Sequence, residues 1–158
     1  MAKVLIVYYS RSGNTKKMAE LIKSGAEKEK LEVILKDVKD TEVGDLLKAD
    51  AIIMGSPVYY GTMAAPLKKL FDDSVSNHGQ LDGKIGGAFS SSANIAGGNE
   101  TTISDILNAM LIHGMIIQGD PQGDHYGPVS IGKPDQRSEK ECIRFGQRIA
   151  QLVKKIKG

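Results

Sequence analysis

Three hydroxyl side chains and a glycine lie close together in one short segment early in the sequence. An apolar, β-branched run at residues 4–9 precedes this segment and a helical pattern follows it, so the segment connects a buried strand to a helix. Backbone N–H groups at the start of a helix attract anions, and hydroxyl groups add donors, so such a turn can hold a phosphate group without a lysine. The segment consists of Ser10, Arg11, Ser12, Gly13, Asn14 and Thr15.

The pattern differs from both of the better-known phosphate loops. It lacks the three glycines of G-x-G-x-x-G, and it lacks the G-x-x-x-x-G-K-[ST] spacing. A plain strand-to-helix turn is also rich in serine and threonine, because these residues cap helices well. The segment alone therefore leaves a phosphate site and a structural turn as alternatives.

Two further clusters of polar and aromatic residues follow apolar runs later in the sequence. The first cluster is a turn with two adjacent tyrosines, and its members are Pro57, Val58, Tyr59, Tyr60 and Gly61. The second is a loop with hydroxyls, an amide and two glycines, and its members are Ser91, Ser92, Ala93, Asn94, Gly97 and Gly98. Each also has a structural explanation, because paired tyrosines can pack on a surface and two glycines before a helix are a common turn signal, with Asn99 as the expected N-cap.

Strand and helix patterns alternate along the whole sequence, which predicts an α/β fold. Short apolar runs typical of strands covered on both faces lie at residues 4–9, 33–38, 51–55, 85–90 and 115–119. Helical spacing of apolar residues covers residues 18–26, 67–75, 103–111 and 142–156, with a short helix at 43–47. Right-handed crossovers then favour a doubly wound, five-stranded parallel sheet of order 2-1-3-4-5 in three layers. No linker or repeat divides the sequence, so we predict a single domain over residues 1–158.

All three clusters follow strands that are predicted to be neighbours, and ligands of doubly wound sheets bind at the carboxyl ends of such strands. The first cluster suits a phosphate, the second offers aromatic rings, and the third offers polar groups for the edge of a ring. Flavin mononucleotide (FMN) has these three parts. We therefore predict an FMN site at this edge of the sheet and no metal site.

Composition limits the other classes of function. The net charge is only +2, from 21 basic and 19 acidic residues, which argues against a nucleic-acid-binding protein. No apolar run reaches the roughly 20 residues that a membrane-spanning helix needs, and no signal-peptide pattern is present. The single cysteine, Cys142, occupies an apolar position of the last helical pattern, so we expect it in the core. These observations favour a cytoplasmic protein.

Four motifs resemble those of known flavoproteins. Residues 10–15 resemble the S/T-x-S/T-G-x-T phosphate loop of the flavodoxin superfamily, and residues 55–64 resemble the G-[ST]-P-x-x-[FY]-G-x-M segment of the WrbA-type NAD(P)H:quinone oxidoreductases. Residues 89–103 are similar to that family's F-[ST]-S-[TS] and G-G-Q-E-x-T-I motifs, and residues 113–115 match its H-G-M. The motifs occur in the same order as in the family and span most of the sequence.

The resemblance implies a flavodoxin-like fold and a role for each motif. Residues 10–15 would bind the phosphate of FMN, residues 57–60 would line its isoalloxazine ring with Tyr60 at the family's aromatic position, and residues 91–98 would contact the pyrimidine edge. His113 matches a histidine near the flavin and is the candidate catalytic residue, although a histidine at a helix end is more often a capping or core residue.

The resemblance also implies an NAD(P)H-dependent oxidoreductase that reduces quinones by two-electron transfer and forms a homo-oligomer. The alternative is a flavodoxin-type electron carrier that docks redox partner proteins. The sequence is shorter than the family pattern at residues 39–50, and it has no tryptophan before the fourth strand. A pI near 8.6 suits an anionic dinucleotide better than it suits a basic redox partner.

Overall fold

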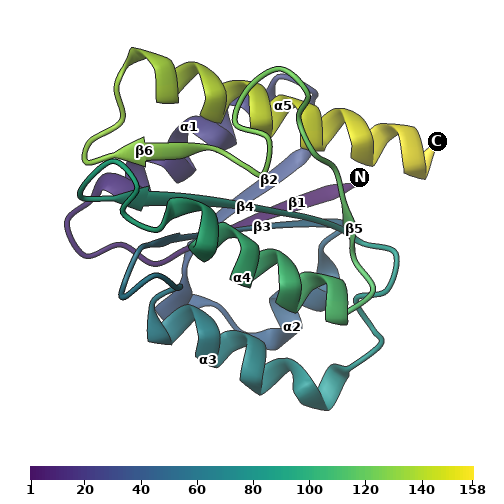
Figure 1. The fold of residues 1–158 in the computed structure, drawn as a ribbon. Helices are drawn as coiled ribbons and strands as arrows, with labels where there is room; N and C mark the ends of the chain where they lie inside the picture. Colours follow the sequence, from purple (N-terminus) through teal and green to yellow (C-terminus); the bar gives the residue numbers. More distant parts are fainter.

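A parallel sheet with strand order β2-β1-β3-β4-β5 forms the centre of the computed structural model, which describes residues 1–158 (Figure 1). The strands are β1 (Lys3–Tyr8), β2 (Glu32–Asp37), β3 (Ala51–Pro57), β4 (Ile85–Ser92) and β5 (Ile116–Ile117). The predicted doubly wound order is confirmed.

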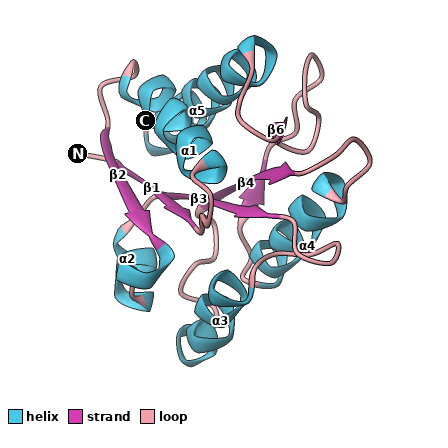
Figure 2. Cartoon of the chain, turned by 90° about the vertical axis from the view of Figure 1, so that its left-hand side faces the viewer, coloured by secondary structure: helices cyan, strands magenta, loops and turns pink.

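Helices cover both faces of this sheet, as the three-layer prediction requires (Figures 1 and 2). One face carries α1 (Asn14–Glu27) and α5 (Gln136–Lys157). The other face carries α2 (Val43–Lys48), α3 (Ala65–Asp73) and α4 (Asn99–Ile112). Two short 3-10 helices, η1 (Val38–Asp40) and η2 (Ser74–Asn77), follow β2 and α3. No helix combines the length and the apolar composition that crossing a membrane would require.

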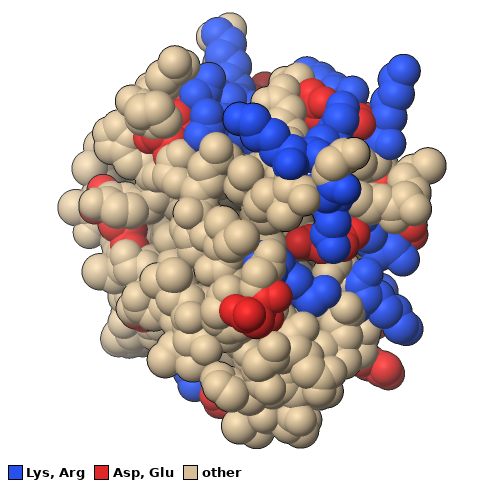
Figure 3. All heavy atoms as spheres, turned by 90° about the vertical axis from the view of Figure 1, so that its right-hand side faces the viewer, with Lys and Arg blue, Asp and Glu red and all other residues tan.

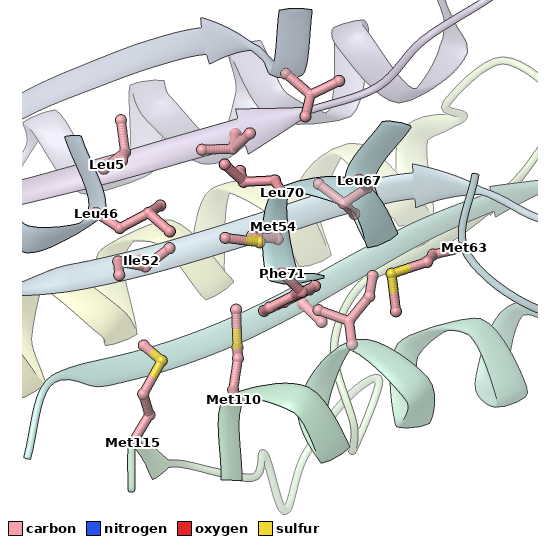
Figure 4. Close-up of a cluster of buried hydrophobic side chains, with 14 of the residues drawn as sticks. Leu5, Leu46, Ile52, Met54, Met63, Leu67, Leu70, Phe71, Met110 and Met115 are labelled. Atoms are coloured by element: carbon pink, nitrogen blue, oxygen red, sulfur yellow. The ribbon is translucent and has the colours of Figure 1, made fainter. Parts of the chain in front are cut away.

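Two apolar clusters fill the spaces between the sheet and its helices, because side chains alternate between the two faces of each strand. In β1, Val4 and Ile6 pack toward α1 and α5. Leu5 packs toward the other layer, where it meets Leu46 and neighbouring side chains of the sheet and helices (Figure 4). The sheet is therefore buried on both faces, which explains the continuous apolar runs in the sequence.

Two glycines let α1 and α5 approach closely. A methyl group at Gly25 would overlap the backbone carbonyl of Ile143, and a methyl group at Gly146 would overlap that of Ile22. Cys142 is buried in the same layer, and burial raises its pKa to about 12, so the predicted core position of this thiol is confirmed.

The edge of the sheet differs from the prediction. The sequence predicts a single fifth strand at residues 115–119, but β5 has only two residues. A second segment, β6 (Val129–Ile131), pairs with β4 farther along that strand. The chain leaves the sheet between them, where Asp120 accepts hydrogen bonds from Arg144 at 2.8 and 2.9 Å. The intervening turn residues interrupt the apolar pattern, so sequence periodicity could not join the two pieces.

Some apolar positions of the predicted helical stripes are also exposed. Val75 lies in η2 beyond the end of α3, and Leu111 and Ile156 lie in the last turns of α4 and α5. Helix ends extend past the sheet, so their apolar residues have less to pack against. Figure 3 looks onto the edge where α5 ends, and basic side chains gather there. The last turn of α5 contains Lys154, Lys155 and Lys157.

Candidate functional site

The carboxyl ends of β1, β3 and β4 bring the three predicted clusters to one edge of the sheet, which faces the viewer in Figure 2. The Tyr9 N–H donates to the Gly55 carbonyl at 3.1 Å, which ties the first loop to β3. The Val58 N–H donates to the Ser91 carbonyl at 3.0 Å, which ties the second loop to β4. Because the three loops are bonded to one another, they can contact a single ligand.

The first loop has the backbone geometry of an anion-binding turn. Gly13 is the N-cap of α1 with φ of 100°, and no side chain caps the helix. The Gly13 N–H donates to Ser10 Oγ at 3.1 Å, which closes the turn. Arg11 and Ser12 are exposed on it. The first-turn N–H groups of α1 therefore have no side-chain acceptor, and an anion can take that role.

Thr15 differs from the other hydroxyls of this loop. Its side chain is only 2% exposed, and its Oγ1 lies 2.9 Å from Ser91 Oγ, in a buried hydrogen bond. This bond joins the first turn of α1 to the end of β4. The two hydroxyls that the sequence assigned to the phosphate and to the ring edge thus bind each other.

The second loop is a tight turn with an unusual backbone. The Tyr59 N–H donates to the Thr62 carbonyl at 2.9 Å, and the Thr62 N–H donates back at 3.3 Å. The two residues between them, Tyr60 and Gly61, have φ of 51° and 80°. Positive φ at both central positions is the arrangement of a type I′ turn, which favours asparagine and glycine over a bulky residue.

Neighbouring elements hold this turn firmly. Ser56 Oγ accepts a hydrogen bond from the Ala64 N–H at 2.8 Å, which folds the loop back onto the end of β3. Thr101 Oγ1, in the first turn of α4, donates to the Gly61 carbonyl at 2.6 Å. A side chain at Gly98 would meet Val58 and Gly61, so the second loop packs directly on the start of α4.

The two tyrosines have different surroundings. Tyr59 is half-buried, and its ring meets that of Tyr9 edge-on, with centroids 6.0 Å apart. It also lines a groove of about 720 Å³ between α3 and α4, together with Met63 and Ile112. Tyr60 is fully exposed and packs on nothing. The ring of Tyr60 is therefore free, whereas that of Tyr59 faces Tyr9 and the groove; that both rings line one ligand stays a prediction.

The third loop presents backbone groups and small side chains. Ser92 Oγ donates to the Asn94 carbonyl at 2.9 Å and accepts from Asn99 Nδ2 at 2.8 Å. Asn99 is not the N-cap that the sequence predicted: Gly98 is, with φ of 102°. Residues 93–96 of this loop, which lie between the hydrogen-bonded Ser92 and Asn99, are exposed.

One neighbour of the site, β6, has no recognisable pattern in the sequence. The Gly132 N–H, just after β6, donates to the Ser92 carbonyl at 2.7 Å, so β6 borders the third loop. Only three residues make up this strand, which is too short a run to show a period.

His113 does not join the other predicted residues. The 14 residues of α4 lead away from the third loop for roughly 20 Å, and His113 caps the far end. It is buried, its Nε2 lies 2.8 Å from Ser74 Oγ, and its ring centroid is 5.9 Å from that of His78. Burial lowers the pKa of His113, with a smaller contribution from His78. Within this chain, His113 is a core residue at the opposite edge of the sheet.

Comparisons with known proteins agree with this geometry. Residues 43–123 match the family model described as "NADPH-dependent FMN reductase". A flavodoxin of Aquifex aeolicus is 43% identical over 97% of this chain and 88% of its own length. An NAD(P)H dehydrogenase (quinone) of Sinorhizobium fredii is 38% identical over 99% of both chains.

Two solved structures extend the likeness to three dimensions. A flavodoxin from the domain Archaea is 35% identical, has a TM-score of 0.81, and aligns over 96% of this chain and 99% of its own. A WrbA-like flavodoxin from Agrobacterium tumefaciens is 26% identical, has a TM-score of 0.83, and aligns over 98% of this chain and 99% of its own.

Proposed function

We propose that this chain is an FMN-binding redox protein. The chain belongs to the flavodoxin superfamily and is related to its WrbA-type members. Its main activity in this proposal is the NAD(P)H-dependent reduction of quinones. One observation supports the proposal most. The start of α1, which has Gly13 as its N-cap and no side-chain cap, has as its neighbour a firmly held turn that carries the exposed ring of Tyr60.

The residues present fit the three parts of FMN. The first loop has free N–H groups, the exposed hydroxyl of Ser12, and Arg11 and Lys16 close by for a phosphate. Tyr60 offers an uncovered ring face for stacking on the flat ring system. The exposed backbone of residues 93–96 can donate and accept hydrogen bonds at the polar ring edge.

FMN, when bound, would supply the redox chemistry of the reaction, in which the hydride of the reduced dinucleotide and one proton from solvent convert a quinone to its hydroquinone. The chain's own residues would bind and orient the flavin and shield it from water. The buried hydrogen bond between Thr15 and Ser91 fixes the first and third loops relative to each other, and the exposed ring of Tyr60 would cover one side of the bound flavin. No side chain in these loops is needed as a general base.

An electron carrier is the second candidate, because two of the relatives above are named flavodoxins. Anaerobic stopped-flow mixing of the holoprotein with NADH or NADPH separates the two candidates. We expect either donor to bleach the flavin absorbance and a benzoquinone to restore it. If neither donor bleaches the flavin over minutes, the carrier replaces the enzyme as the proposed function.

The homo-oligomer, the redox partner protein and the cytoplasmic location remain predictions. Sedimentation of the holoprotein tests whether it forms a homo-oligomer.

FMN rather than FAD is the expected flavin, because the first loop offers one phosphate site and the sequence has no G-x-G-x-x-G motif. Chromatography of the extracted cofactor against standards tests this identity.

A further inference from the structure

The groove of about 720 Å³ between α3 and α4 starts at the second loop. Pockets of about 300–1,000 Å³ are typical of sites for small ligands. Tyr59 and Thr62 of the second loop form part of its wall. These two residues exchange the hydrogen bonds that close the turn, so Tyr60 and Gly61 lie between them. The groove therefore begins at the base of the turn that carries the exposed ring of Tyr60.

The groove is separate from the groups that would hold FMN. The first loop, the ring of Tyr60 and residues 93–96 do not line it. Of the residues that the resemblance assigns to the flavin ring, only Tyr59 lies in its wall. The remainder of the wall comes from the end of the second loop, from α3 and from the later turns of α4, so a ligand in the groove leaves the flavin's phosphate and ring edge undisturbed.

The lining of the groove selects an uncharged, apolar ligand. Met63 and Ala65 contribute apolar surface. Lys68 forms an ion pair with Asp72 at 2.6 Å, so its ammonium group is engaged and its aliphatic stem is left to line the groove. Asp105 forms no ion pair, and its carboxylate in the wall repels anionic ligands such as nucleotides and fatty acids.

The shape of the groove suits a long, narrow ligand. Its wall follows α4 from Asp105 to Ile112, over which the helix rises roughly 10 Å. The side chain of Ile112 is 74% exposed, so a ligand that reaches this end of the groove covers apolar surface that the protein leaves open to water.

We propose that this groove binds an apolar side chain of the quinone, an inference that rests on the proposed function. The quinone ring lies at the carboxyl edge of the sheet, next to the turn that carries Tyr60, and its side chain extends between α3 and α4 toward Ile112. The substrates of this chain are therefore quinones with an isoprenoid side chain, in preference to unsubstituted benzoquinones.

Two measurements on the holoprotein test the inference. Calorimetric titration of the oxidised holoprotein compares quinones with the same ring and no side chain, one isoprene unit or two, and no redox step occurs because both components are oxidised. Steady-state reduction of the same quinones by NADH or NADPH gives the KM of each. The variants are Ala109→Gln and Ile112→Gln, which place an amide in the wall of the groove. The matched control is Leu111→Gln, an exposed apolar position of the same helix that does not line the groove.

Each isoprene unit should tighten binding to the wild type by about tenfold, because burial of apolar carbon is favourable and an open groove buries only part of each unit. The KM values should fall in the same order. Ala109→Gln and Ile112→Gln should reduce this gain from the side chain, whereas Leu111→Gln should keep it. Because Ile112 is largely exposed, its replacement removes little packing from the fold.

Failure of the inference is distinguishable from failure of the proposed function. If a reduced dinucleotide bleaches the flavin but quinones with and without a side chain bind equally, the groove is not the quinone site, and the enzyme stands. If neither donor bleaches the flavin while the side chain tightens binding in a manner that Ala109→Gln abolishes, the enzyme fails and the groove remains a site for an apolar chain. If both groove variants keep the full gain from the side chain but change the sedimentation of the holoprotein, the groove is an interface between copies of this chain, which overturns the inference.

Discussion

Replacing Tyr60 by asparagine should move fold stability and flavin affinity in opposite directions. Tyr60 has φ of 51°, and the left-handed conformation costs an ordinary residue about 1–2 kcal/mol. Asparagine tolerates this conformation, and Asn-Gly is a favoured pair in type I′ turns. The ring of Tyr60 is fully exposed, so its removal takes no packing from the protein without ligand.

The stability gain can be put in numbers. Relief of about 1 kcal/mol should raise the midpoint temperature of the apoprotein by about 2–4 °C for a domain of this size. The affinity loss has a separate origin, because stacking on an aromatic partner contributes about 0.5–1.5 kcal/mol beyond plain burial. Tyr60→Asn should therefore weaken FMN roughly tenfold, since 1.4 kcal/mol is a factor of ten.

Thermal unfolding of the apoprotein and fluorescence titration with FMN measure the two effects. Tyr60→Phe is the matched control, because it keeps both the ring and the positive φ, and it should resemble the wild type in both assays. A Tyr60→Asn apoprotein that melts below the wild type would refute the strain argument. Unchanged FMN affinity in that variant would refute the assigned ring contact.

Three more predictions follow from other parts of the molecule. Ser12→Ala should weaken FMN by about tenfold through loss of a charge-assisted hydrogen bond and leave riboflavin unchanged; equal losses in titrations of the two ligands would mean that the first loop is not the phosphate site. Gly146→Ala should lower the free energy of unfolding by about 1–3 kcal/mol, because the added methyl overlaps the Ile22 carbonyl, whereas Gly44→Ala, with open space around it, should not; urea unfolding measures both. Burial lowers the pKa of His113 in the folded protein, so the folded state favours the neutral ring. This preference costs no stability above the pKa of the unfolded chain, about 6.5. As the pH falls from there toward the pKa in the folded protein, the free energy of unfolding decreases. The His113→Asn variant should show a flatter decline of unfolding free energy between about pH 7.5 and pH 5, and the same slope in both proteins would contradict the assignment.

The sequence predicted the framework of the site well, for physical reasons. A strand that is buried on both faces must be apolar throughout, so the runs at β1, β3 and β4 were visible, and so were the polar residues that end them. Right-handed crossovers then left few strand orders. The meeting of the three loops followed from the order alone.

Contacts in the folded structure decide the side-chain orientations that the sequence could not predict. Residue type does not tell whether Thr15 faces a ligand or Ser91, because a hydroxyl suits both. Tyr59 and Tyr60 are identical in type, and only the backbone of the turn directs one ring inward and the other outward. His113 matched a family motif, but the length of α4 sets it at the opposite edge.

These outcomes change how the site is expected to bind its ligand. The sequence analysis offered the hydroxyls of Thr15, Ser91 and Ser92 as ligand donors, yet all three form hydrogen bonds within the protein, as do those of Ser56 and Thr101. Because these bonds fix the three loops before any ligand arrives, the loops need little ordering on binding. The groups left for the ligand include backbone N–H groups, the Ser12 hydroxyl, the cations of Arg11 and Lys16, and the ring of Tyr60. Hydroxyl substitutions at the buried positions should therefore reduce the stability of the apoprotein as well as the affinity for FMN, whereas substitutions of Ser12 should change affinity alone.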